Sequence, residues 1–385
     1  MREFPLKERG LGRKGYGKEP NPDKLARAGF EKSPELEAFL NNVDFATMRS
    51  IFEEQYVRSG GKAAEMNFIS PDRIYVGTRG GALATYHSRQ NVIAFNKKKG
   101  ENLQTFVNPP PFFEPVGESE FYAAPDIEDK IFSKIEAVFK VLHEEAHAVS
   151  SNSAEEIGGI LRSLFVRNYR FGSGYRTADR QENTISSSTE TRLLGEIVNE
   201  GVTQLLALNV LSDYYRRKGS DDLGVTSADA QKYISCFNSD LFRIGFSRKP
   251  EVEFVRIFVE YLAEVAAVPR DTVWQGVLRG YIHGGDLFDE HIAKAFQENG
   301  DSDIFNALQS FDARLSNARL KGDDPANGKN VRSDAISDAN AQMYEALSNE
   351  SKEFLADIFE DTSGVKVKKI GDDWISYAKM AELNL

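Results

Sequence analysis

The sequence contains one cysteine, five histidines and no long apolar segment. Because Cys236 is the only cysteine, no intrachain disulfide can form, and nothing in the composition indicates an oxidising compartment. A run of about 18 apolar residues, which a transmembrane helix needs, does not occur, and the first residues lack the apolar core of a secretory signal. We therefore expect a cytoplasmic protein without a membrane partner, and export by a route without a classical signal stays open.

Basic residues are outnumbered by acidic ones, 48 to 59, which gives a formal net charge of -11. A general nucleic-acid binder needs a basic face for its phosphate contacts, so this balance argues against a nucleic-acid partner. The rest of the composition, 41% hydrophobic and 28% charged, is typical of a globular protein. A chain of 385 residues is long enough for one large domain with appendages or for two smaller domains.

Polar stretches without apolar periodicity lie near both ends of the chain. The first residues carry glycine, proline and scattered charge, and ARLKGDDPANGKNVRSD is polar and rich in turn-forming residues. We therefore expect a flexible N-terminal arm (1–33), one domain (34–317) that is β-rich at first (34–150) and helical afterwards (151–317), a linker (318–334) and a C-terminal helical tail (335–385).

Strand character is confined to a few short parts of the chain, and helical spacing of apolar residues dominates elsewhere. RIYVGT and GGALATYHSRQNVIAFN read as strands, the second as two strands joined by the turn HSRQ. In 161–186, glycines interrupt an aromatic and basic run, which predicts a hairpin or an irregular excursion. The predicted fold class is α+β, with a small mixed N-terminal sheet over the helix at 127–150 and a mainly helical C-terminal part. Helices are expected at about 34–55, 127–150, 187–217, 227–244, 250–267, 270–281, 286–298 and 335–360, the third with serine or threonine as its N-cap.

The helix expected at 127–150 carries the motif HEEAH. Residues four apart lie on one face of a helix, so His143 and His147 can both bind a single ion, at about 2.0 to 2.1 Å. Glu144 then projects beside the ion, where a general base would take a proton from metal-bound water. With five histidines in 385 residues, a chance HExxH is expected with a probability on the order of 0.01. The motif therefore predicts a zinc site.

A tetrahedral catalytic zinc usually has three protein ligands and a water, so a third ligand must come from elsewhere. No histidine follows at the HExxHxxGxxH spacing, and the helix expected at 187–217 offers Glu196 and Glu200. On a helical wheel Glu200 and Gln204 lie against the apolar stripe. Glu196 turns toward the polar side, which carries Asn199 and Thr203. A carboxylate at the edge of a buried stripe needs a partner such as a cation, so Glu200 is the better candidate. Gln204 could orient a histidine ligand, and the alternative for Glu200 is an exposed acid near a helix start.

HEEAH followed by VNEGVTQLL resembles the gluzincins, the clan of zinc peptidases that includes the thermolysin-like and alanyl-aminopeptidase families. In that clan the third ligand is a glutamate in an NEG or NEA context. The resemblance implies a zincin-like fold, Zn²⁺ as cofactor, His143, His147 and Glu200 as zinc ligands and Glu144 as the general base. It covers about 127–215.

Two features depart from the pattern of that clan. Gln204 stands where the clan usually has an acidic residue, and glutamine brings no charge that would raise the basicity of a histidine ligand. Fifty-two residues separate His147 from Glu200, more than in the best-known members. The hairpin expected at 161–186 accounts for this extra length, so we expect it to be an insertion beside the cleft.

The strand GGALATYH is in the order expected of the edge strand that binds an extended substrate in zincins. The aminopeptidase branch has a Gly-x-Met-Glu-Asn stretch there, which this chain lacks, so an endopeptidase is favoured. Hydrolysis also needs a donor for the oxyanion. Tyr175 and His283 are our candidates, while Tyr169, Arg170, Arg176 and Tyr281 are alternatives and His283 could simply be a turn residue.

The sequence therefore predicts a zinc-dependent peptidase that acts on a polypeptide substrate by means of metal-activated water and a glutamate base. One alternative is a catalytically silent zincin-fold module with a binding or regulatory role. The intact Glu144 argues against that alternative, because a chain free of catalytic demand need not keep a base beside the metal. Another alternative is an effector or toxin peptidase that acts in another cell. The oligomeric state cannot be read from the sequence.

Overall fold

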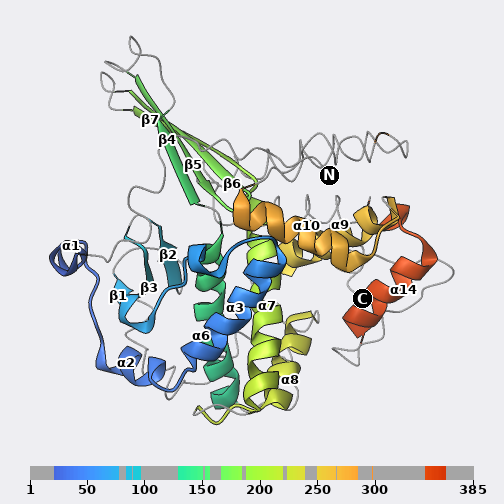
Figure 1. Cartoon of the computed structure of the whole chain (residues 1–385), viewed down its shortest axis with the longest axis horizontal. Coiled ribbons are helices and arrows are strands. Elements are labelled where there is room, and N and C mark those ends of the chain that lie inside the picture. Colours follow the sequence, from blue (N-terminus) through green and yellow to red (C-terminus); the bar gives the residue numbers. More distant parts are fainter. Residues whose placement is uncertain are drawn as a thin grey trace, which may run out of the picture.

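Two helices, α6 (Asp129–Val149) and α7 (Glu196–Lys218), lie side by side at the centre of the computed structural model (Figure 1). Helix α3 (Phe45–Arg58) packs against both, and α9 (Lys249–Val265) packs against α7. These helices and the N-terminal sheet bury one continuous apolar core. The structure describes residues 21–77, 84–88, 90–96, 129–150, 152–156, 166–183, 188–219, 223–238, 249–265, 267–284, 297 and 343–360.

The N-terminal sheet has three strands in the order β1-β3-β2. Strand β1 (Ile74–Gly77) is parallel to β3 (Val92–Asn96), and β2 (Ala84–His87) is antiparallel to β3 at one edge of the sheet. The pairing of Tyr86 with Ile93 confirms the predicted turn between the last two strands. Because the sheet packs on α6, largely through β2, the predicted α+β class is confirmed.

Two asparagines, the partly buried Asn67 and the buried Asn91, attach the turn between β2 and β3 to the end of α6. The side-chain nitrogen of Asn67 donates to Asn91 Oδ1 (2.9 Å) and to the carbonyl oxygen of Ala148 (3.2 Å). Asn91, with φ 53°, adopts the left-handed conformation that asparagine tolerates better than most residues. The hydroxyl of Tyr86 donates to the same Asn91 oxygen (3.0 Å). This network fixes the edge strand β2 relative to the helix that carries the HEEAH motif.

Glu145 attaches the segment before β1 to α6. Its carboxylate is fully buried, and Oε2 accepts a hydrogen bond from the backbone N–H of Ile69 (3.0 Å). Burial raises the pKa of Glu145 well above its ordinary value. The second glutamate of HEEAH therefore points into the protein core and has a structural role.

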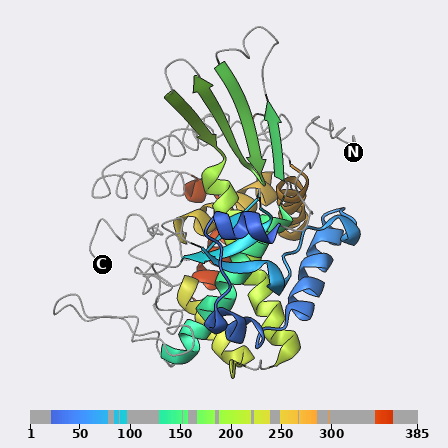
Figure 2. The ribbon, with the colours of Figure 1, turned by 90° about the vertical axis from the view of Figure 1, so that its left-hand side faces the viewer.

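A second sheet is formed by the residues that follow α6 and precede α7 in the sequence. Its four antiparallel strands follow one another in the order β4 (Asn152–Glu156), β5 (Val166–Ser173), β6 (Arg176–Asn183) and β7 (Ser188–Leu194). The sheet stands out from the helical body in two perpendicular views (Figures 1 and 2). The hairpin expected at 161–186 is confirmed as β5 and β6, although the flanking strands β4 and β7 were not predicted.

The helix expected at 187–217 begins later than the sequence suggested. Residues 188–194 form β7, and α7 starts at Glu196 after Gly195, whose φ of 72° interrupts regular structure. Of the serines and threonines interpreted as N-caps, Ser188, Thr189 and Thr191 belong to this strand, and residues 186 and 187 lie outside the described part of the chain. No side chain caps α7. Thr189 and Thr191 suit a strand, and β7 pairs with the preceding strand β6 in an antiparallel hairpin.

The helix expected at 34–55 is two helices, α2 (Pro34–Leu40) and α3. Asp44 separates them, because its side chain accepts a hydrogen bond from the backbone N–H of Thr47 (3.0 Å) and so caps α3. Within the arm expected at 1–33, α1 (Pro22–Arg27) carries Leu25, which is buried against the sheet. The C-terminal part of that arm is therefore packed on the domain.

The predicted C-terminal helices are largely confirmed in the described part of the chain. They are α8 (Ser227–Asn238), α9, α10 (Arg270–His283) and α14 (Asn349–Glu360). Ser351 of α14 donates to Glu260 of α9, so the described part of the tail lies against α9. The helix expected at 286–298, except for residue 297, and the linker at 318–334 lie outside the described residues. Among the helices described, none combines the length and the apolar character that a membrane span requires.

The glycine that follows Glu200 permits a close crossing of α7 and α9. A Cβ atom on Gly201 would lie 2.3 Å from the backbone oxygen of Glu251 and 2.6 Å from a methyl group of Val255. Neither position can be vacated cheaply, because one belongs to the backbone and the other to a packed core side chain. The crossing therefore requires glycine in the NEG sequence.

We predict that Gly201→Ala destabilises the protein by about 1 to 3 kcal/mol, the usual cost of overpacking a core. Gly276→Ala in α10 is the matched control, because a Cβ there meets nothing within 4 Å. The free energy of unfolding of the control should rise by up to about 1 kcal/mol, because alanine has a higher helix propensity than glycine. Urea unfolding of both variants measures the difference, and a Gly201→Ala variant as stable as the wild type would contradict the prediction.

Candidate metal centre

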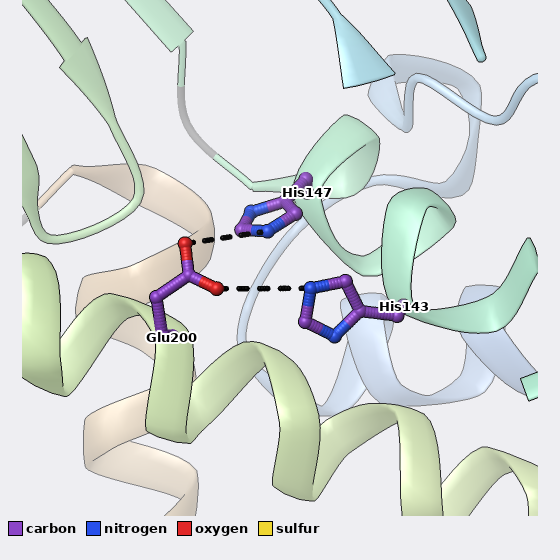
Figure 3. A group of neighbouring side chains, drawn as sticks. All are labelled: His143, His147 and Glu200. Carbon is purple, nitrogen blue, oxygen red and sulfur yellow. Dashed lines mark ion pairs between the residues drawn. The ribbon is translucent and has the colours of Figure 1, made fainter. Parts of the chain in front are cut away.

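His143 and His147 lie one turn apart on α6 and face Glu200 of α7 across the helix interface (Figure 3). The Nε2 atom of His143 is 3.7 Å from Glu200 Oε2, and the Nε2 atom of His147 is 3.8 Å from Glu200 Oε1. The Glu200 side chain is 7% exposed, and the histidine side chains are 12% and 14% exposed. The three predicted ligands therefore converge, at a place that retains a small opening to solvent on the histidine side.

The donor atoms are close enough to share one ion. One ligand atom from each residue lies within 4.8 Å of the others. In a tetrahedral zinc site with bonds of about 2.1 Å, ligand atoms are roughly 3.4 Å apart. The distances of 3.7 and 3.8 Å run to different oxygens of Glu200, and each exceeds that value by a few tenths of an ångström. Side-chain rotations would be needed to bring one oxygen close to both imidazoles. Two imidazole nitrogens and one carboxylate oxygen therefore form a group that could hold a metal ion.

The amphipathic pattern of the two helices explains why these residues meet. On α6, apolar residues at 138, 139, 142, 146 and 149 are buried, and the histidines flank that stripe. On α7, Glu200 and Gln204 are both buried, as the helical wheel predicted. The wheel was wrong about the side that carries Asn199 and Thr203, because these two residues are also buried, 1% and 0% exposed. Glu196, the other candidate ligand, has a side chain outside the described part of the structure.

Glu144, the second residue of HEEAH, reaches from α6 to the edge of the N-terminal sheet. Its side chain is buried, and Oε2 accepts a hydrogen bond from the backbone N–H of Tyr86 in β2 (2.6 Å). In an antiparallel pair, successive residues of a strand direct their N–H and C=O groups alternately toward and away from the partner strand. Because the Tyr86 N–H reaches Glu144, it points away from β3. The outer edge of β2 therefore faces the predicted general base.

Thr203 is a residue of the site that the sequence reasoning missed. Its Oγ1 lies 3.4 Å from Nδ1 of His147, the ring nitrogen opposite the one that faces Glu200. Gln204, which we expected beside a histidine ligand, is the next residue along α7 and is also buried. The sequence could have indicated Thr203, because it follows Glu200 by three positions and residues three apart lie on one face of a helix.

The two candidates for oxyanion stabilisation occupy different surroundings. The hydroxyl of Tyr175 is buried and donates to the carbonyl oxygen of Val277 in α10 (2.7 Å). His283, the last residue of α10, packs with its ring centroid 5.7 Å from that of Tyr56. These contacts do not test a catalytic role, and both assignments stay predictions.

Comparison of the chain with protein-family models, with curated proteins and with solved structures gives no match. The resemblance to gluzincins is therefore carried by the residues themselves. The buried group of His143, His147 and Glu200 fits the geometry of a site built from HExxH and a distant glutamate.

We predict that zinc binds this group and raises the melting temperature of the wild-type protein. At a free concentration of about 100 times its dissociation constant, a ligand stabilises the folded state by about 2.7 kcal/mol. His143→Ala and Glu200→Gln should lose most of this zinc-dependent shift, and a chelator should reverse it in the wild type. Thermal unfolding followed by circular dichroism with and without zinc measures the effect.

His87→Gln is the matched control for this experiment. His87 lies at the end of β2, where its ring packs against Phe30 with a centroid distance of 4.9 Å. This variant should keep the full zinc-dependent shift. An equal shift in the wild type and in His143→Ala would show that zinc binds elsewhere.

Proposed function

We propose that the protein is a zinc-dependent endopeptidase of the gluzincin type. The observation that carries the proposal is the convergence of His143, His147 and Glu200 from two helices, with Glu144 directly after the first ligand. A histidine pair alone would leave the metal short of a ligand, and a distant glutamate in an NEG sequence supplies it.

The donor set favours zinc over magnesium and calcium. Neutral imidazole and carboxylate are common zinc ligands, whereas magnesium and calcium prefer sites made of oxygen atoms alone. Three protein ligands leave a fourth position for water, which is the arrangement of catalytic rather than structural zinc sites. When bound, zinc would polarise a substrate carbonyl and lower the pKa of a coordinated water toward about 7.

Glu144 is the group that moves the proton. Its carboxylate directly follows a ligand on α6 and reaches the outer edge of β2, so it lies next to both the ligand group and the strand. There it takes a proton from the attacking water and passes it to the leaving amine. Glu145 cannot share this role, because its carboxylate is turned into the core toward Ile69.

The substrate is an extended polypeptide that lies along β2. An edge strand with backbone groups directed outward can pair with another extended chain, which supplies binding through main-chain hydrogen bonds. The Tyr86 N–H supports this proposal because it points outward beside Glu144. The chain lacks the glutamate-containing stretch that holds the free amine of aminopeptidase substrates, so we propose cleavage within chains.

We predict that the wild type cleaves an unfolded protein such as casein and that Glu144→Gln lowers the rate by about 10² to 10⁴, the usual contribution of a general base. Glutamine has nearly the same shape and keeps an acceptor for the Tyr86 N–H, so zinc content should not change. Fluorogenic casein measures turnover, and elemental analysis measures zinc.

Glu145→Gln is the matched control, because it makes the same chemical change one residue further along the helix and should leave turnover within about twofold. Zinc bound at one per chain without turnover by the wild type would favour the silent binding module. Equal turnover by Glu144→Gln and the wild type would remove Glu144 as the base.

A further inference from the structure

A fully buried tyrosine hydroxyl joins the two helices that carry the ligands. Tyr281 of α10 has no exposed surface, and its hydroxyl donates to the carbonyl oxygen of Ala146 (3.0 Å). The same hydroxyl is 2.7 Å from Oγ1 of Thr203. Ala146 directly precedes His147 on α6, and Thr203 follows Glu200 by three residues on α7. Tyr281 is therefore hydrogen-bonded to both helices beside their ligands.

The hydrogen bonds of Thr203 determine which nitrogen of His147 carries a proton. Thr203 has one hydroxyl proton, and two oxygen atoms compete for it at 2.7 Å, the carbonyl oxygen of Asn199 and the hydroxyl of Tyr281. Both are closer than Nδ1 of His147, at 3.4 Å. Thr203 therefore presents a lone pair to Nδ1, which donates its proton. This tautomer leaves the lone pair of Nε2 directed toward Glu200, as a metal ligand requires.

The turn between β5 and β6 of the second sheet holds Tyr281 in place. Tyr175, at the turn between β5 and β6, packs against Tyr281 with a ring-centroid distance of 6.3 Å. Its backbone N–H donates to Asn199 Oδ1 (3.1 Å), and a Cβ on Gly280 would lie 2.3 Å from its hydroxyl. Gly174 is equally constrained, because a Cβ there would lie 2.6 Å from the Tyr281 ring. The turn between β5 and β6 thus packs directly against the side chain of Tyr281.

We propose that Tyr281 and Thr203 are positioning residues that hold the imidazole of His147 for metal binding. Tyr281 sets the place of the Thr203 hydroxyl, and that hydroxyl fixes the orientation and tautomer of the ring. A neutral pair of hydroxyls here does what a carboxylate or carbonyl oxygen does at most histidine ligands. The inference rests on the proposed metal site and goes beyond it by assigning residues that set its affinity.

The test compares zinc affinity among conservative variants, measured by competition with a chromophoric chelator. Loss of an outer partner of a histidine ligand weakens metal binding by about 10- to 100-fold. Thr203→Val removes the hydroxyl at nearly constant shape, so its zinc affinity should be about 10- to 100-fold weaker than that of the wild type. Tyr281→Phe removes the hydroxyl that positions Thr203. Because this effect on His147 is indirect, zinc binding should weaken by about 10-fold, the lower end of the range. Thr203→Ser keeps the hydroxyl and should bind within about threefold of the wild type.

Tyr214→Phe is the matched control for loss of a buried tyrosine hydroxyl. Tyr214 lies on α7, is fully buried, and accepts a hydrogen bond from the backbone N–H of Asp44 (3.0 Å). Its zinc affinity should equal that of the wild type even where its stability falls. The visible absorption of the cobalt-loaded protein, which reports ligand geometry, should change in Thr203→Val and stay unchanged in Tyr214→Phe.

The outcomes separate this inference from the proposed function. Wild-type affinity in both Thr203→Val and Tyr281→Phe would overturn the positioning role while leaving the metal site intact. If Tyr281→Phe does not fold, weak binding by Thr203→Val with recovery in Thr203→Ser supports the inference, and equal binding by those two variants overturns it. A wild type that binds no zinc would overturn the metal site and this inference together.

Discussion

The packing of α6 against α7 is the constraint on which the rest of the structure depends. It brings two imidazoles from one helix to within 3.7 and 3.8 Å of a carboxylate from the other. A carboxylate that is almost fully buried is costly unless a cation or protonated partner compensates its charge. The glycine after Glu200 serves a second interface of α7, because it permits the close crossing of α7 with α9. The candidate metal centre and the helical core are therefore a single packing arrangement.

Local features of the sequence were enough to predict which three residues converge in the candidate metal centre, and also the fold class. HEEAH within an apolar period of 3.6 placed His143 and His147 on one helical face, and the wheel placed Glu200 on a buried stripe. The sequence failed in two places. The strand β7 was mistaken for a helix start, because its serine and threonines suit a helix N-cap as well as a strand. The contact between Tyr281 and Thr203 spans 78 residues, and no spacing rule predicts it.

The second sheet explains how two candidate ligands, His147 and Glu200, can meet although 52 residues lie between them. The chain leaves the end of α6, forms four antiparallel strands that follow in order, and returns to the start of α7. Such a meander brings its ends close together, so its length matters little to the helices that it joins. Its middle turn reaches back to the body through Tyr175 and contacts the residues around the site.

The hydrogen bond between Glu144 and β2 also bears on how the protein avoids self-association. An uncovered sheet edge is a template for unwanted pairing with other chains, and natural proteins blunt such edges with charged side chains. Here a carboxylate occupies the outward Tyr86 N–H of the edge strand. Any chain that pairs with β2 at this position must first displace that carboxylate. The contact that occupies this edge position is thus also the one that orients the proposed general base, Glu144.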